Sequence, residues 1–331
     1  MAIFRIIREM QIPLVGCLYF GIIDRGTNLL QVRPSSICNL NCPFCSVDAG
    51  SYSRSRVTGY EIELNYILDW ARQIAEFKGR GVECHIDSTG EPMLYPQISE
   101  LVRGLKEISE VSVVSMQSNG TLLDGAKIKE LEESGLDRIN LSMQALSPDL
   151  AKQLAGVSWY DIEHIKDVAR EIAASQMDLL IAPVYLPGIN DYEIPKLIEF
   201  AQEAGAGKRW PPLGIQKFEA HKLGRKPSGI KVQTWWRFYN WSIKDWQKKF
   251  SLKLLISPRD FGLEKRPMLP PVFRMNEKIH VDIRGPGWIR GEQLGVARDR
   301  VVSVLNCPVD NGLVKVKILN TKHNIYIGTP F

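Results

Sequence analysis

Residues 29 to 218 alternate between short apolar runs and longer segments with helical periodicity, and this alternation restricts the fold more than any other feature. The apolar runs are LLQVRP, GVECHID, VSVVSMQ, DRINLSM, MDLLIAPVY and LGIQKF, and the helical segments lie at 59–77, 98–108, 122–135, 161–175 and 192–205. Strands separated by helices of this length form βαβ units with a parallel sheet. The sequence therefore predicts an α/β fold, a partial (βα)6 TIM-like barrel whose chemistry lies on the loops after its strands.

The segments outside this alternation predict a hairpin before it and a helix and a second, smaller barrel after it. The apolar run IPLVGCLYFGII, followed by DRGTN and LLQV, is typical of a β-hairpin. The helical stripe expected to be buried comprises Val232, Trp235, Trp236, Tyr239, Ile243, Trp246 and Phe250. The predicted domains are the hairpin extension 1–29, the α/β barrel 30–225, the basic aromatic helix with its Pro-rich linker 226–274, and a small TRAM/OB-like β-barrel 275–331.

Charge is distributed unevenly along the chain and indicates a polyanionic partner. Residues 206–274 contain 16 Lys and Arg against 4 Asp and Glu, a net charge of +12, whereas the whole chain carries only +5. The run at 12–23 has only 12 residues, which is too short to span a membrane, and no small-residue cleavage site follows it. We therefore expect a cytoplasmic protein without a membrane partner.

Three of the six cysteines lie within eight residues, in the segment SSICNLNCPFCSVDAG. Cys38, Cys42 and Cys45 form a C-x3-C-x2-C pattern without a second cysteine pair, so a four-ligand zinc site would need a remote ligand such as Cys84 or Cys307. A four-iron cluster held by three thiolates instead leaves one iron open. The pattern fits a metal centre that binds a further molecule, and structural zinc remains the alternative.

The cysteine loop resembles that of the radical S-adenosylmethionine (SAM) enzymes, with an aromatic residue, Phe44, just before the last cysteine. Four further stretches agree in order with that family across residues 30–225. TGEPMLYP resembles its GEP motif, QSNGTLL its ribose-contacting turn, and INLSMQAL and YLPGIND the polar positions of its fourth and fifth strands. The resemblance implies a [4Fe–4S] cluster and SAM as cofactors. It also implies reductive cleavage of SAM to a 5′-deoxyadenosyl radical that abstracts hydrogen from a substrate.

The same resemblance implies the ligands of each cofactor. The cluster ligands are Cys38, Cys42 and Cys45, and the SAM-binding residues are Phe44, Gly90, Glu91, Pro92, Asn119, Ser142, Gln144 and Asn190. Each SAM residue also has a simpler interpretation, because Gly, Pro and Asn are ordinary turn residues and Asn190 is placed to cap a helix. Catalytic residues are unknown, and Cys84 is the first candidate because its strand lines the predicted barrel.

The C-terminal 55 residues resemble a TRAM domain, a small β-barrel that binds RNA in several RNA-modifying enzymes. A tryptophan among cations on one helix face also suits base stacking beside phosphate contacts. The RNA-binding residues expected are Arg237, Trp241, Lys244, Lys248, Arg284, Trp288, Arg290, Arg298, Arg300, Lys315 and Lys317. A solvated lysine face and a barrel used only for packing are the alternatives.

Together these features predict a radical SAM enzyme that modifies an RNA nucleotide, with tRNA as the expected partner and a ferredoxin- or flavodoxin-like protein as electron donor. The chain has no second cysteine cluster, which disfavours sulfur insertion. A radical SAM enzyme acting on a small metabolite or lipid precursor is one alternative. A non-enzymatic RNA-binding protein with a structural metal site is the other.

Overall fold

The computed structural model describes residues 2–331, which form two compact units. Unit 1 comprises residues up to 38 together with 53–114 and 265–331, and unit 2 comprises 39–52 and 115–264. One boundary between them falls inside the cysteine loop, directly after Cys38. The predicted domain limits at residues 29, 225 and 274 stay predictions, since the compact units join segments that are distant in sequence.

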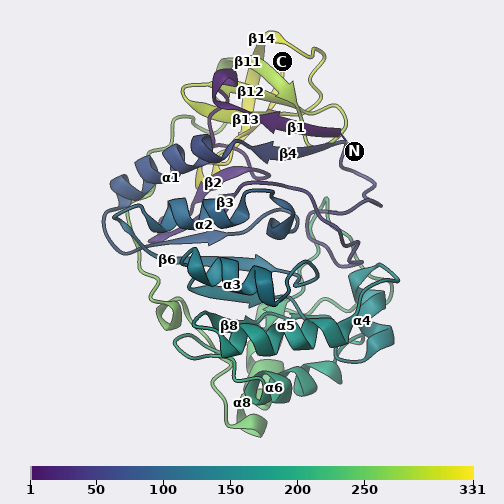
Figure 1. The fold of residues 1–331 in the computed structure, drawn as a ribbon. Helices are drawn as coiled ribbons and strands as arrows, with labels where there is room; N and C mark the ends of the chain where they lie inside the picture. Colours follow the sequence, from purple (N-terminus) through teal and green to yellow (C-terminus); the bar gives the residue numbers. More distant parts are fainter. Residues whose placement is uncertain (1) are drawn as a thin grey trace. The chain divides into compact units, whose positions relative to one another are not determined.

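Unit 1 contains the first strands of the α/β fold (Figure 1). Its sheet has the order β2 (Gly21–Asp24), β3 (Leu29–Arg33), β5 (Val82–Ile86) and β6 (Val111–Ser118), and β6 continues into unit 2. Strands β2 and β3 are antiparallel, so the predicted hairpin is confirmed, although its first strand is four residues long. Strands β3 and β5 are parallel, and α1 (Leu64–Lys78) and α2 (Ile98–Lys106) are the helices of this unit.

The predicted helix at 59–77 is wrong over its first residues. Thr58–Ile62 form strand β4, which pairs in parallel with β1 (Ala2–Ile6), and α1 begins only at Leu64. Tyr60 is fully buried in this strand. The pairing of two segments more than fifty residues apart decides the conformation, and the local pattern carries no signal for it.

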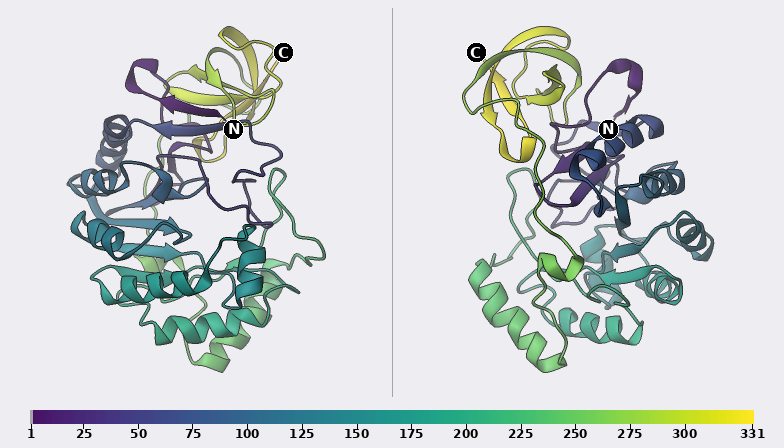
Figure 2. Two further views of the ribbon diagram at one scale, coloured as in Figure 1. Left: turned by 45° about the vertical axis from the view of Figure 1, so that its right-hand side comes forward. Right: turned by 90° about the vertical axis from the view of Figure 1, so that its left-hand side faces the viewer.

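Unit 2 continues the parallel α/β pattern. Strand β6 pairs with β7 (Arg138–Leu141), and β7 pairs with β8 (Asp178–Ile181), all in parallel. Its helices include α3 (Gly125–Glu133), α4 (Pro148–Ala155), α5 (Ile162–Ala174) and α6 (Glu193–Glu203), of which the sequence did not predict α4. Helices α3, α5 and α6 lie along one side of the strands of this unit (Figure 2).

The sixth predicted strand is found at its predicted place, but only two of its residues form a regular strand. Only Gln216–Lys217 form a strand, β10, which pairs with β9 (Val184–Tyr185) outside the sheet, and one isolated bridge joins Leu213 to Ile181. Two prolines and a glycine, Pro211, Pro212 and Gly214, occupy the approach to this strand. The amides of Gly214, Gln216 and Phe218 nevertheless donate to the carbonyls of residues 181, 183 and 185 at 2.9, 2.8 and 3.3 Å, so the segment runs parallel to 181–185 although little of it is regular strand.

The predicted helix at 231–250 begins at Trp235 and contains a π-helical turn. It consists of α7 (Trp235–Arg237), the π-helical η3 (Phe238–Ile243) and α8 (Lys244–Phe250). The amide of Lys244 bonds to the carbonyl of Tyr239, five residues earlier. A π turn adds one residue and rotates the following side chains about the helix axis.

This turn changes which aromatic residues are buried. Phe238, Ile243 and Trp246 are buried, whereas Trp235, Trp236 and Tyr239 are exposed. The predicted buried stripe is therefore wrong at those three positions, because a regular 3.6-residue period does not describe the segment, and it is also wrong at Val232, which is exposed and precedes the helix.

The C-terminal residues form the predicted small β-barrel. Strands β11 (Lys278–Pro286), β12 (Gln293–Ala297), β13 (Arg300–Val304), β15 (Ile327–Pro330) and β14 (Gly312–Asn320) close in that order. Val281, Val302, Val316 and Ile318 are among its fully buried core residues. Buried and exposed side chains alternate along β11 and most of β14, whereas β12 and β13 contain consecutive buried residues.

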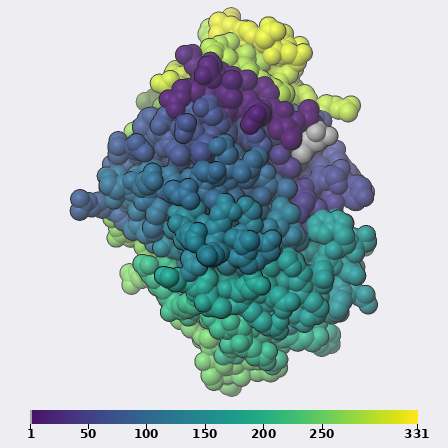
Figure 3. Space-filling view, in the orientation of Figure 1, coloured from purple at the N-terminus to yellow at the C-terminus, as the bar shows by residue number. Residues whose placement is uncertain are grey.

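The barrel belongs to unit 1 and packs on the N-terminal residues of that unit (Figure 3). The amide of Val301 bonds to the carbonyl of Val15 at 2.9 Å, and the amide of Tyr326 bonds to the carbonyl of Gly16 at 2.9 Å. The apolar segment at 12–17 is therefore buried against the barrel, and the hairpin strand begins only after it. No helix within residues 2–331 is long and apolar enough to cross a membrane.

Candidate functional site

The cysteine loop begins in unit 1 beside the glycine turn that follows β5. The carbonyl of Ile37, directly before Cys38, accepts the amide of Glu91 at 2.7 Å. A Cβ atom on Gly90 would lie 2.0 Å from the same carbonyl, so only glycine fits here. The sequence assigned this glycine to close approach of a cofactor, whereas the close approach that the structure contains is to the backbone before the first cysteine.

The remaining residues of this turn are buried and ordered. The carboxylate of Glu91 accepts the amide of Met93 at 3.0 Å and caps the short 3-10 helix η2 (Pro92–Leu94). Glu91 and Pro92 are both buried. The predicted contact between the backbone of this turn and a cofactor ammonium group stays a prediction.

Arg56 joins both of these loops, and the sequence analysis did not identify it. Its buried guanidinium donates to the carbonyls of Ser36 and Thr89, which lie just before Cys38 and Gly90. The same guanidinium lies over the ring of Trp288, 3.6 Å from its centroid. Arg56 thereby connects the start of the cysteine loop, the glycine turn and the C-terminal barrel within unit 1.

The second part of the cysteine loop lies in unit 2 and is shaped by short-range hydrogen bonds. The amide of Cys45 bonds to the carbonyl of Cys42 at 3.1 Å, and the amide of Ala49 donates to the Cys45 sulfur at 3.2 Å. The side chain of Asn41 accepts the amide of Tyr52 at 2.9 Å. Amide hydrogen bonds to cysteine sulfur are among the features that tune iron–sulfur clusters.

Three thiols of the loop are available as metal ligands, and their predicted role as cluster ligands stays a prediction. Cys38, Cys42 and Cys45 are each half-buried and form no disulfide. Within residues 2–331, no three Cys, His, Asp or Glu side chains converge on one point as the ligands of a single metal ion do. In a four-iron cluster each thiolate binds a different iron, so the sulfur atoms stay apart.

Asn119 belongs to a closed ring of three hydrogen bonds. Its amide donates to Asn39 Oδ1 at 2.9 Å, Asn39 donates to Thr121 Oγ1 at 2.8 Å, and Thr121 Oγ1 donates to Asn119 Oδ1 at 2.7 Å. The ring ties the residue after Cys38 to the turn that follows β6. Asn39 and Thr121 were missed because isolated polar loop residues carry no sequence signal.

The polar residues after β7 also have partners in unit 2. Ser142 Oγ accepts the side-chain amide of Gln117 at 2.7 Å, and Gln144 Oε1 accepts the amide of Val184 at 2.6 Å. Both side chains are half-buried. They follow the C-terminal end of a parallel strand, where ligands of α/β folds bind.

Asn190 is fully buried and holds the loop after β9. Its amide donates to the carbonyls of Gln144 and Val184 at 3.0 Å each, and its Oδ1 accepts the amide of Leu186 at 2.7 Å. These three hydrogen bonds to main-chain atoms give Asn190 a structural role, because they hold the loop in place. The predicted contact of Asn190 with SAM stays a prediction.

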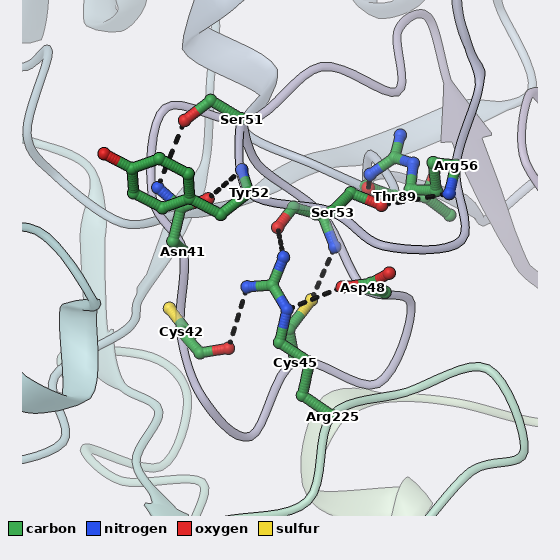
Figure 4. A network of polar contacts seen from close by, with 11 residues as sticks. Asn41, Cys42, Cys45, Asp48, Ser51, Tyr52, Ser53, Arg56, Thr89 and Arg225 are labelled. Atoms are coloured by element: carbon green, nitrogen blue, oxygen red, sulfur yellow. Dashed lines mark hydrogen bonds and ion pairs between the residues drawn. The ribbon is translucent and has the colours of Figure 1, made fainter. Parts of the chain in front are cut away.

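Arg225, which follows β10, grips the cysteine loop (Figure 4). Its guanidinium pairs with Asp48 at 2.6 Å and donates to the carbonyls of Cys42 at 3.2 Å and Ala49 at 2.6 Å. Its own amide donates to the carbonyl of Cys45 at 2.8 Å. The sequence contains no signal for this contact, because its two sides are 177 residues apart in the chain.

Burial makes two of the other cysteines, Cys17 and Cys84, poor sources of a thiolate. Cys84 is fully buried, and burial raises the pKa of its thiol to about 12. The thiol of Cys17 is equally buried, and its pKa is also raised to about 12, first by burial. Cys84 therefore keeps its proton at neutral pH, and a catalytic role for it stays a prediction.

The residues predicted to contact RNA on the helical segment are exposed. The Arg237 guanidinium lies over the Trp241 ring, 4.7 Å from its centroid, and Lys244 donates to Asn240 at 2.7 Å. Trp241 and Lys248 are exposed as well. All of these residues lie in unit 2.

On the barrel, the prediction for Trp288 is wrong. This ring is only 1% exposed and stacks on Tyr19 with the centroids 4.0 Å apart and the planes 7° from parallel. A ring buried in this way cannot receive a nucleotide base. The resemblance to a TRAM domain made it a candidate for base stacking, and the sequence does not show its partners, which lie far away in the chain.

The predicted basic residues of the barrel differ in their surroundings. Arg284 pairs with Asp282 at 2.6 Å and Arg298 with Glu277 at 2.7 Å, and Arg300 donates to its neighbour's carbonyl at 2.8 Å. Arg290 and Lys315 are exposed, and Lys317 is half-buried. The strand register sets His280 opposite Lys315 and Lys278 opposite Lys317 on one outward face.

Comparison with known proteins agrees with this description. A sequence model described as the Radical SAM superfamily matches residues 32–201. An uncharacterized protein from Methanocaldococcus jannaschii is 42% identical, over 96% of this chain and 78% of that protein. A GTP 3′,8-cyclase from Chlorobaculum tepidum is 28% identical, over 66% of this chain and 62% of that enzyme.

Among solved structures, SuiB from Streptococcus suis bound to S-adenosylmethionine matches with a TM-score of 0.52 and 22% identity. The match covers 68% of this chain and 48% of that one. At this level of identity the likeness concerns the fold, which is the mixed α/β fold described above.

Proposed function

Because the chain belongs to the radical SAM superfamily, we propose that it modifies a nucleotide within RNA, with tRNA as the first substrate to test. Members of the family bind a [4Fe–4S] cluster and SAM, which together supply a 5′-deoxyadenosyl radical when an electron is delivered. The electron donor proposed is a ferredoxin- or flavodoxin-like protein. The two parts of the proposal rest on different residues.

The cofactor part rests on the cysteine loop and the loops that adjoin it. Cys38, Cys42 and Cys45 are the proposed cluster ligands, and the backbone of the Gly90–Pro92 turn is the proposed partner of the SAM ammonium group. Ser142 can donate to the SAM carboxylate, and Phe44 can pack on the adenine ring. The protein orients these groups and excludes water around them.

The RNA part is carried by one observation, an aromatic surface made of Trp235, Trp236, Tyr239 and Trp241. These side chains are 50%, 63%, 39% and 55% exposed. The ammonium of Lys217 lies 4.8 Å from the centroid of the Trp235 ring, and Arg237 lies over Trp241. Exposed aromatic rings among cations bind unstacked bases and phosphates together.

The barrel supports the same proposal less directly. Its outward face carries Lys278, His280, Lys315 and Lys317 on adjacent strands. A TRAM-like role would use such cations for phosphate contacts, which carry most of the affinity for nucleic acid and weaken with salt. We propose this face as an additional phosphate-binding surface.

A free purine nucleotide is the second candidate substrate. It is favoured by the similarity to proteins named GTP 3′,8-cyclase. The chain spans 62% of the Chlorobaculum tepidum enzyme, so the activity of that whole protein does not transfer directly.

The test is anaerobic reconstitution of the chain with iron and sulfide, followed by addition of SAM and dithionite. Parallel reactions receive no substrate, GTP, or bulk tRNA from a cell that lacks the gene. We expect 5′-deoxyadenosine to increase with tRNA and a nucleoside of altered mass to form. A Cys42→Ala chain should release none. An increase with GTP alone would instead select the free nucleotide.

A further inference from the structure

We propose that Arg225 is a positioning residue for the iron–sulfur centre, which it serves by fixing the path of residues 42–49 before the cluster is loaded. The proposal rests on the proposed function for the identity of the cluster. Its structural part concerns one loop and one arginine of unit 2, and can be tested in the chain without iron (Figure 4).

The first argument is the number and direction of the contacts. Arg225 donates to the carbonyls of Cys42, Cys45 and Ala49, and its guanidinium pairs with Asp48. Two of these carbonyls belong to predicted cluster ligands. Bonds to the carbonyl of a cysteine fix its backbone, and hence the direction of its Cα–Cβ bond, while leaving the thiol available.

The second argument is the fit of this residue type to this place. The guanidinium is planar and presents donors in several fixed directions, so it can reach a carboxylate and two carbonyls at the same time. A lysine ammonium is a compact charge on a flexible stem and cannot reproduce this fork. The Asp48 side chain is 6% exposed and that of Arg225 is 19% exposed, so the pair is largely shielded from water.

The backbone on both sides of the Arg225–Asp48 pair has features that allow the two segments to approach closely. Asp48 has a φ of 51°, in the left-handed region that residues other than glycine seldom adopt. A Cβ on Gly224 would lie 2.8 Å from the carbonyl oxygen of Ser46, so a glycine lets this segment approach the loop. The unusual conformation and the close approach both occur where Arg225 meets the loop.

The charges predict a second effect, on the cluster itself. Cluster reduction potentials depend on nearby net charge and on hydrogen bonding. Loss of the Arg225 cation should lower the potential, and loss of the Asp48 anion should raise it. A purely structural role would give both variants the same direction of change, so the opposite signs distinguish positioning at the centre from general stabilisation.

The first experiment measures hydrogen exchange of residues 40–52 in the iron-free chain. The variants are Arg225→Gln, Arg225→Lys and Asp48→Asn. The control is Arg170→Gln, which removes an exposed Arg–Asp pair on α5 of the same unit. We expect loop exchange to accelerate roughly tenfold or more in both Arg225 variants and to be unchanged in the control.

The second experiment measures iron per chain after anaerobic reconstitution, the electron paramagnetic resonance spectrum of the reduced cluster, and its midpoint potential. Arg225→Gln should hold less iron and have a lower potential, while Asp48→Asn should have a higher one. Wild-type exchange, iron content and spectrum in Arg225→Gln would overturn the proposal.

The proposal can still be tested if the Arg225→Gln variant does not fold or if the wild-type chain takes up no cluster. If Arg225→Gln does not fold, Asp48→Asn decides, because it leaves the three main-chain contacts of Arg225 in place and changes only the charge. If the wild-type chain itself takes up no cluster, the proposed function fails, whereas the exchange experiment still decides whether Arg225 orders the loop.

Discussion

The C-terminal barrel and the helical segment 235–250 each contain a tryptophan that contacts an arginine. The tryptophan is buried in the barrel and exposed on the helical segment. In the barrel, Trp288 is buried against Tyr19, and Arg56 lies over it. On the helical segment, Trp241 is exposed, and Arg237 lies over it. The same pair of residue types therefore stabilises unit 1 in one case and forms an accessible surface of unit 2 in the other.

The difference shows that the role of a Trp–Arg pair depends on the other contacts of the arginine and not on the pair itself. Arg56 also donates to carbonyls beside Cys38 and Gly90, so it cannot leave Trp288 without releasing two loops of the site. No hydrogen bond of the Arg237 guanidinium is seen within the described residues. A cation–π pair that is shielded from water is stronger than an exposed one.

The largest expected effect is on folding, from Trp288→Ala. Removing a buried tryptophan leaves a cavity and costs about 3–5 kcal/mol in the free energy of unfolding. We expect this loss in urea unfolding of the iron-free chain, together with faster hydrogen exchange around residues 36–38 and 89–91. Trp241→Ala is the matched control and should change the unfolding free energy by less than about 0.5 kcal/mol. Equal losses in the two variants would contradict the comparison.

The second effect is on RNA affinity. Here the exposed Trp241, and not the buried Trp288, is expected to matter. Stacking on one aromatic side chain contributes about 1–3 kcal/mol per base, so Trp241→Ala or Trp236→Ala should weaken tRNA binding roughly five- to 150-fold. Fluorescence anisotropy with labelled tRNA at fixed salt measures this. Phe250→Ala, at the half-buried end of the same segment, serves as the control. Unchanged affinity in both tryptophan variants would remove the aromatic surface from the RNA proposal.

The sequence was most informative where a short local pattern determines the structure. Cys38, Cys42 and Cys45 lie within eight residues, and the glycine turn and the strand-end residues follow strands that alternation identifies. The barrel strands were predicted for the same reason, since inward and outward residues alternate along β11 and β14.

The sequence was least informative where contacts between residues far apart in the chain determine the structure. The burial of Trp288 depends on Tyr19 and Arg56, more than two hundred residues earlier. The contact of Arg225 with Asp48 joins two turns that show no pattern in the sequence. The π turn at Phe238–Ile243 shifted the aromatic stripe by one residue, an irregularity that no fixed helical period predicts.

A third effect separates charge from stacking in RNA binding. The double variant Lys315→Ala/Lys317→Ala removes two cations of the barrel face that lie opposite His280 and Lys278. Each lost phosphate contact should reduce the slope of log affinity against log salt by about 0.7 to 1, with little dependence on RNA sequence. Binding measured across a salt series gives the slope. Trp241→Ala should weaken affinity while leaving the slope nearly unchanged, and the opposite pattern would assign phosphate binding to the helical segment.

The smallest expected effect concerns pH, and it tests the burial of the turn that carries Trp288. Glu292 accepts the amides of Trp288 at 3.1 Å and Ile289 at 3.2 Å, and burial raises the pKa of its carboxyl above 4.5. A carboxyl whose pKa is raised by folding stabilises the protein below the unfolded pKa, and this stabilisation is lost as pH rises through the folded pKa.

Glu292→Gln keeps an oxygen acceptor for both amides and removes the titration. The variant should therefore gain thermal stability relative to the wild type as pH rises from 4.5 to 8, with its midpoint measured in the iron-free chain. A difference in midpoint that is constant over this range would mean that Glu292 is solvated, and that the turn holding Trp288 opens readily. Such opening would weaken the contrast between the two tryptophans, because Trp288 would then also be accessible for part of the time.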